Sequence, residues 1–185
     1  MTHSSPFLRV LAGSLVTLSF LLTGCGGGET SSADSTELAS NDYESVVGWM
    51  PDPKTLTREQ AHSGRYAVKV DVANEYGMGY GQLLAKALDH KPVKMRIEGW
   101  AMMADANSKA RLDFQLINLL TNKAVVYDGI AYDTVIKSYG KWVKISKDIS
   151  LPATITSNLE LRVFLWRAGA TSPAYLDDLR ISEVK

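Results

Sequence analysis

The chain has 185 residues, in which 20 Lys and Arg balance 20 Asp and Glu, and it contains a single cysteine. The balanced charge excludes the strongly basic surface that nucleic-acid binding requires, and a single cysteine excludes an internal disulfide. No repeat of ~20–50 residues is visible, which argues against solenoids and propellers.

The first 24 residues are typical of a secretory signal peptide. Arg9 is the only basic residue before a nearly continuous apolar stretch at 10–22, which is shorter than the ~20 residues of a membrane-spanning helix. The sequence Leu-Thr-Gly-Cys follows and ends at Cys25. It resembles the lipobox of bacterial lipoproteins, which implies that Cys25 becomes the acylated N-terminus and anchors the mature protein in a lipid bilayer. The alternative is an ordinary secretory signal that contains a cysteine.

The mature chain would consist of a tether and one domain. Residues 26–41 lack aromatic residues and have few large apolar ones, so they cannot bury enough surface to offset ordering. We therefore expect a signal peptide at 1–24, a lipid-anchored flexible tether at 25–41 and a domain at 42–185. Gly26, and not Asp, follows the cysteine, so we expect an envelope location at the outer membrane or cell surface.

Apolar residues alternate with polar ones along most of the domain, and turn-forming residues separate the runs. This pattern predicts an all-β antiparallel sandwich or barrel. About nine strands are expected, at 43–49, 65–72, 76–84, 93–103, 111–116, 124–132, 142–149, 159–166 and 175–184. A helix of two turns at 82–90 is the alternative for one segment.

Short motifs follow one another in a fixed order along the domain. They are Asn-x-Tyr-Glu at 41–44 with Gly-Trp at 48–49, His-Ser-Gly-Arg-Tyr-Ala-Val-Lys-Val at 62–70, Gly-Trp-Ala at 99–101, Gly-Lys-Trp-Val-Lys at 140–144 and Tyr-Leu-Asp-Asp-Leu-Arg-Ile at 175–181. In this order they resemble the jelly-roll carbohydrate-binding modules of families four and nine, within the galactose-binding-like group. The resemblance implies a two-sheet jelly roll that binds glycans without cleaving them.

Asp177 needs a partner, because alternation places it with Tyr175, Leu179 and Ile181 on an apolar face, and a carboxylate there is costly unless it is paired or metal-bound. The resemblance implies a structural calcium held by the side chains of Asp177 and Glu44 and by the carbonyl of Ser63 or a neighbour. Such a set of oxygen ligands suits calcium. The alternative is a salt bridge from Asp177 to Arg65 or Lys69.

Enzyme signatures are scarce. The sequence has no Gly-x-Ser-x-Gly elbow, no His-Glu-x-x-His zinc motif and no Glu-x-Asp-x-x-Glu glycosidase strand. The glycine run at 77–81 lacks the final glycine of a dinucleotide-binding loop. We therefore expect a binding protein and not an enzyme.

One outward face combines flat aromatic side chains with hydrogen-bonding groups, as sugar recognition requires. Its predicted members are Trp100, Arg111, Asp113, Gln115, Arg162, Phe164 and Trp166. The alternative is a bulge at Gly99 that turns Trp100 into the core, with Trp166 covering a sheet edge; the next candidates are then Tyr76, Tyr80, Tyr127 and Tyr132. The competing function is a structural or assembly lipoprotein that binds a protein partner in the cell envelope.

Overall fold

The computed structural model of the chain describes Met1, residues 35–45 and residues 54–185. Contacts divide the chain into Met1–Ser31 and Ser32–Lys185, and all the features below belong to the second unit. The predicted signal peptide, Cys25 and the Gly-Trp pair at 48–49 lie outside the described residues. In the part of the chain that is described, no helix has the length and apolar character to cross a membrane.

The described residues form ten strands and two short helices. The strands are β1 (Ser35–Asn41), β2 (Leu56–Thr57), β3 (Ala67–Val70), β4 (Tyr80–Leu83), β5 (Lys94–Met103), β6 (Arg111–Asn118), β7 (Lys123–Ala131), β8 (Val143–Ser150), β9 (Leu159–Trp166) and β10 (Ala174–Val184), and the helices are α1 (Leu84–Ala87) and α2 (Tyr132–Val135). The predicted all-β fold is therefore confirmed. The helical alternative at 82–90 is realised only as the single turn of α1.

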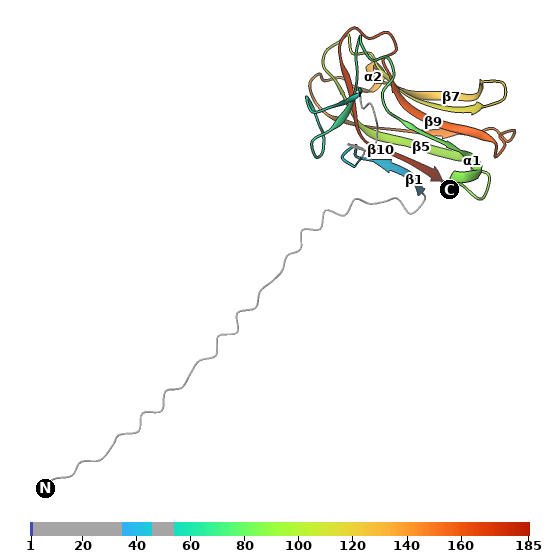
Figure 1. Ribbon diagram of the computed structural model, residues 1–185, viewed down its shortest axis with the longest axis horizontal. Coiled ribbons are helices and arrows are strands. Elements are labelled where there is room, and N and C mark those ends of the chain that lie inside the picture. The colour runs from blue at the N-terminus through green and yellow to red at the C-terminus, as the bar shows by residue number, and fades with distance from the viewer. Residues whose placement is uncertain (2–34, 46–53) are drawn as a thin grey trace. The chain divides into compact units, whose positions relative to one another are not determined.

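The strands form two antiparallel sheets packed as a jelly-roll sandwich (Figure 1). The six-stranded sheet has the order β2-β3-β10-β5-β8, and its sixth strand, β1, also pairs with β10. The four-stranded sheet has the order β4-β9-β6-β7. β10 is the organising strand of the larger sheet. Its first half pairs with β3 and its second half with β1 on one side, while β5 follows it on the other side.

The core lies between the sheets because one side chain in two points inward from each strand. In β9, Leu159, Leu161, Val163 and Leu165 are buried, and the residues between them are only partly covered. In the facing sheet Met95 and Ile97 of β5 belong to the same core cluster. Each fully buried side chain of this kind contributes about 1.5–3 kcal/mol.

An ion pair links the two sheets along the edge formed by β7 and β8. Lys147 Nζ lies 2.6 Å from Asp128 Oδ1 and donates to the carbonyl of Gly129 at 3.1 Å. Lys147 lowers the pKa of Asp128 against the opposing effect of burial. The pair thus closes the sandwich where no backbone ladder joins the sheets.

The first strand lies earlier in the sequence than predicted. β1 occupies residues 35–41, which the sequence analysis assigned to the tether, while Tyr43 has a left-handed φ of 62°. Asn41 Oδ1 accepts the Tyr43 N–H at 2.8 Å, which turns the chain at the point where the strand was expected to begin. The domain therefore starts before residue 42, and Leu38 of β1 packs on the core.

We predict that a fragment of residues 42–185 is less stable than one of residues 35–185. The shorter fragment loses the ladder to β10 and the packing of Leu38, a loss of at least about 2 kcal/mol, or roughly 4–8 °C in melting temperature. Thermal unfolding followed by circular dichroism measures the difference. Equal melting temperatures would show that β1 adds nothing to the domain.

Candidate functional site

The outer face of the four-stranded sheet carries most of the predicted glycan-binding residues. In the antiparallel ladder between β6 and β9, Arg111 pairs with Trp166, Asp113 with Phe164 and Gln115 with Arg162. Because direct partners in a ladder point to the same side of a sheet, all six side chains share this surface. The sequence alternation therefore identified their common face correctly.

Two tyrosines that the sequence analysis ranked second complete this surface. Tyr76 forms an isolated bridge with Trp166, and its ring meets the ring of Phe164 edge-on at 5.8 Å. Tyr127 lies opposite Gln115 in the β6–β7 ladder. Of the other two candidates, Tyr132 is fully buried and Tyr80 packs against the core. We call the resulting surface the aromatic face: Tyr76, Arg111, Asp113, Gln115, Tyr127, Arg162, Phe164 and Trp166.

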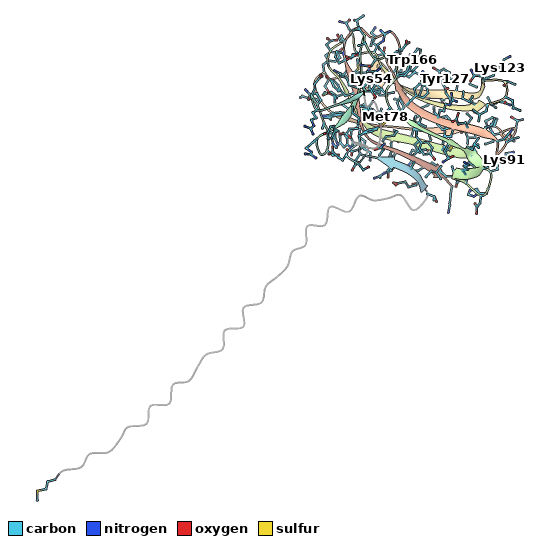
Figure 2. All side chains as sticks on the ribbon, viewed as in Figure 1. Lys54, Met78, Lys91, Lys123, Tyr127 and Trp166 are labelled. Atoms are coloured by element: carbon cyan, nitrogen blue, oxygen red, sulfur yellow. The ribbon has the colours of Figure 1, made fainter. Side chains whose placement is uncertain are left out.

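The aromatic rings are only partly covered, which is costly without a partner. Tyr76 is 58% exposed and Tyr127 is 52% exposed. Trp166 (labelled in Figure 2) is held in place by its indole N–H, which donates to Glu75 Oε1 at 3.2 Å, and its side chain is half-buried. Partly solvent-exposed aromatic rings that cluster on one surface are typical of a binding site.

The polar groups of the aromatic face are fixed by one another. Asp113 is 2% exposed, and it accepts the Tyr127 hydroxyl at 3.0 Å and pairs with Arg111. The Arg111 guanidinium also lies over the Tyr127 ring, 5.2 Å from its centre. Burial raises the pKa of Asp113, and the Arg111 and Tyr127 hydrogen bonds oppose that rise. Asp113 therefore orients its neighbours, and both of its oxygens are already engaged.

Two glycines keep β4 from covering this surface. A Cβ at Gly79 would lie 2.2 Å from the Val163 carbonyl oxygen and 2.6 Å from the Phe164 Cβ. Gly81 pairs with Arg162, which itself donates to Glu160 Oε2 at 2.6 Å. The backbone of β4 thus approaches β9 closely, and no side chain at Gly81 screens Arg162.

Trp100 does not share the aromatic face. It points outward, as predicted, and Gly99 forms no bulge, because the β5–β8 ladder is regular there. However, β5 belongs to the six-stranded sheet, so Trp100 lies on the opposite side of the sandwich. Its ring stacks on the His62 imidazole at 3.8 Å between centres and 12° between planes. Alternation reveals the side of a strand but not which sheet the strand joins.

Asp177 is buried on the outer side of the six-stranded sheet, not in the core. It pairs with Trp100, and the register shifts between Asp177 and Arg180, where Asp178 has a left-handed φ of 48°. This bulge reverses the alternation, so that Leu176 before it and Leu179 after it both enter the core. The prediction that Asp177 points inward was wrong for this reason.

The 62–66 loop covers Asp177 and satisfies it with backbone hydrogen bonds. Asp177 Oδ2 accepts the N–H groups of His62 at 2.8 Å and Ser63 at 3.1 Å, and Oδ1 accepts that of Asp178 at 2.8 Å. Burial raises the pKa of Asp177, and these N–H groups oppose the rise. The predicted alternative of a salt bridge fails, because Lys69 pairs with Glu59 and Asp71, and Arg65 lies near Glu44.

Glu44 holds the other end of the same loop. Its Oε1 accepts the N–H groups of Arg65 at 2.6 Å and Tyr66 at 2.7 Å, which lower its pKa. Gly64 is required between the two carboxylates, because it has a φ of 57° and its Cβ would lie 2.5 Å from the Glu44 carboxyl group. His62 and Ser63 contribute a further link through the Asp178 carboxylate, at 2.6 and 2.8 Å.

The three predicted calcium ligands, Glu44, Ser63 and Asp177, thus meet at one loop, where backbone N–H groups donate to both carboxylates. Three backbone N–H groups donate to the carboxylate of Asp177, whereas calcium takes six to eight oxygen ligands. Among the described residues no group of three or more His, Cys, Asp or Glu side chains is placed to hold a metal ion. Calcium binding stays a prediction.

Comparison with known proteins supports the fold. No protein-family model matches the sequence, and no curated protein does. The xylan-binding domain CBM22-1 of Paenibacillus barcinonensis Xyn10C is 19% identical with a TM-score of 0.52, covering 82% of this chain and 97% of that domain. The CBM22-1–CBM22-2 tandem of the same protein is 19% identical with a TM-score of 0.54, covering 84% of this chain and 51% of the tandem.

A cyclase from Fischerella sp. TAU is a further similar structure, at 11% identity and a TM-score of 0.44, covering 70% of each chain. At these identities the likeness shows the jelly-roll fold alone. The similar structures include carbohydrate-binding modules of families 22 and 16. The resemblance to families four and nine stays a prediction.

We predict that Asp177→Ala destabilises the domain by about 3 kcal/mol, or roughly 6–12 °C in melting temperature, because three part-buried N–H groups lose their carboxylate acceptor. Thermal unfolding measures the loss, and Asp133→Ala, at an exposed carboxylate on α2, serves as the control. A loss under about 1 kcal/mol would contradict the role of Asp177.

Thermal unfolding also tests whether the domain binds calcium. If the hydrogen bonds alone satisfy Asp177, the melting temperature is the same in excess chelator and in millimolar calcium. A rise in calcium that Asp177→Ala abolishes would establish the metal site instead.

Proposed function

We propose that the aromatic face binds carbohydrate, as a poly- or oligosaccharide chain, and that the protein performs no catalysis. The observation that carries this proposal is the combination of partly exposed rings from Tyr76, Phe164 and Trp166 with the fixed group of Arg111, Asp113 and Tyr127. Pyranose rings present both flat C–H surfaces and hydroxyl groups. Ring stacking and oriented hydrogen bonds meet these two requirements together.

The fixed geometry of the polar groups supports binding over catalysis. The Asp113 carboxylate is held by Arg111 and Tyr127, and Glu160 accepts from Arg162. A hydrolytic pair needs one carboxyl group that donates a proton and a second that acts as base or nucleophile. The carboxylates at and beside this face, Asp113, Glu160 and Glu75, already accept hydrogen bonds from Arg111, Arg162 and Trp166. The remaining arginine N–H groups are left to meet sugar hydroxyls.

The likeness to xylan-binding domains is consistent with this proposal at the level of the fold. Function depends on the site and not on the fold, so the argument depends on the residues of the aromatic face. The outer surface of a sheet offers several neighbouring strands to a chain-like ligand. The competing hypothesis, a protein partner in the cell envelope, would use the same rings without requiring sugar.

We further propose that the protein is held at a bacterial membrane by acylation of Cys25. The support is the signal-peptide pattern and the Leu-Thr-Gly-Cys sequence that ends at this residue. Two or three acyl chains anchor a protein stably, whereas a single chain binds only marginally. In this arrangement the domain would present its aromatic face to glycans at the cell envelope.

We predict that the wild-type protein binds at least one soluble polysaccharide, and that Phe164→Ala and Trp166→Ala each weaken this binding about 10-fold. This corresponds to the ~1.4 kcal/mol expected for the loss of one aromatic contact. Calorimetry against a panel of plant and bacterial polysaccharides measures the affinities. Trp100→Ala, on the opposite side of the sandwich, is the matched control and should bind normally once its folding is verified.

Two outcomes would contradict the proposal. If Trp100→Ala loses binding while Phe164→Ala and Trp166→Ala keep it, the site lies on the six-stranded sheet. If the wild type binds no polysaccharide in the panel but co-purifies with an envelope protein through Trp166, the assembly function is favoured.

We predict that Cys25→Ala abolishes acylation and releases the protein from the membrane fraction. Metabolic labelling with palmitate and fractionation after a high-salt wash provide the measurement. An unlabelled wild type, or a mutant that remains with the membranes, would contradict lipid anchoring.

A further inference from the structure

The end of the sandwich where the chain enters the domain has its own surface character. Ser35 pairs with Val184, and Lys94 pairs with Ser150, at one end of the six-stranded sheet. The segments 84–93 and 151–158 connect this end to Leu83 and Leu159 of the four-stranded sheet. We call it the entry end.

The β6–β7 hairpin tip lies at the entry end, because Asn118 pairs with both Leu159 and Lys123. Its two leucines point into solvent: Leu119 is 51% exposed and Leu120 is 91% exposed. The tip is held in shape by Asn118, whose Oδ1 accepts the N–H groups of Leu120 at 3.0 Å and Thr121 at 3.2 Å. The leucines are therefore presented by a structured turn.

A third apolar side chain and several lysines accompany these leucines. Val93 is 74% exposed, and Lys86, Lys91 and Lys123, together with the single acidic residue Asp89 of the 84–93 segment, are exposed at the same end. Lys91 and Lys123 lie at the same end of the domain in Figure 2, away from Trp166. Protruding leucines at an end of the domain that also exposes lysines match the interface of a bilayer, where acyl chains lie beneath anionic headgroups.

The proposed anchor limits where a bilayer can be. Cys25 precedes Ser35 by ten residues, and ten residues span at most about 35 Å when fully extended. If Cys25 is acylated, the membrane must therefore lie within this distance of Ser35. Ser35, the first residue of β1, lies at the entry end.

We propose that the hairpin tip at Leu119 and Leu120 contacts the lipid bilayer and orients the domain, an inference that rests on the proposed acylation of Cys25. The aromatic face then points away from the membrane at its Trp166 end. Arg111, the partner of Trp166, is separated from Asn118 by the length of β6, about 24 Å at ~3.4 Å per residue. A glycan would be held clear of the lipid headgroups at that end.

The test uses the full acylated protein reconstituted into vesicles of phosphatidylethanolamine and phosphatidylglycerol. Cys25 is the only cysteine, and acylation converts its thiol into a thioether, so Leu120→Cys supplies the one thiol for an environment-sensitive fluorophore. The matched control is Val135→Cys, which is 45% exposed on α2. That helix follows Ala131, the partner of Arg111, at the opposite end of the domain.

We expect the fluorophore at position 120 to shift to shorter wavelength and to be quenched by nitroxide lipids at least threefold more than at position 135. Aqueous iodide should quench the two positions in the reverse order. Equal quenching of both positions in protein that remains with the vesicles would overturn the hairpin contact while leaving the anchor intact. Protein that does not stay with the vesicles would overturn both the anchor and the orientation inferred from it.

Discussion

The bulge in β10 is the feature on which the arrangement of the six-stranded sheet depends. It lets a single strand pair with β3 along its first half and with β1 along its second, and it changes which side chains enter the core. Asp177 at this bulge is buried beneath the 62–66 loop and accepts three backbone N–H groups. A buried carboxylate is tolerated only when such partners are present, so the loop and the bulge require each other.

The two outer surfaces of the sandwich differ in what covers their aromatic side chains. On the six-stranded sheet the aromatic rings of Trp100 and His62 stack on each other and help to cover the bulge. On the four-stranded sheet Gly79, just before β4, and Gly81 of β4 leave Phe164 and its neighbours open. Similar residue types therefore serve structure on one side and are proposed to serve recognition on the other, and the difference comes from what covers them.

The aromatic face also shows how fixed polar groups prepare the proposed binding surface. Asp113 cannot be reached easily by solvent, yet it sets the positions of Arg111 and Tyr127. Donors that are already oriented lose little freedom when a ligand binds. The exposed apolar side chains are divided between the two ends of this sheet. Leu119 and Leu120 lie in the β6–β7 turn at the entry end, and the aromatic rings lie toward Trp166.

The sequence by itself determined the strands with strict alternation, such as 93–103 and 159–166, because the period of two is a local property of the chain. It also placed Arg111, Asp113, Gln115, Arg162, Phe164 and Trp166 on outward faces. Only the tertiary structure decided that Trp100 belongs to the other sheet, that β1 begins at residue 35 and that Asp177 leaves the core at a bulge. Sheet membership and bulges depend on pairing between distant segments, which alternation within one strand cannot encode.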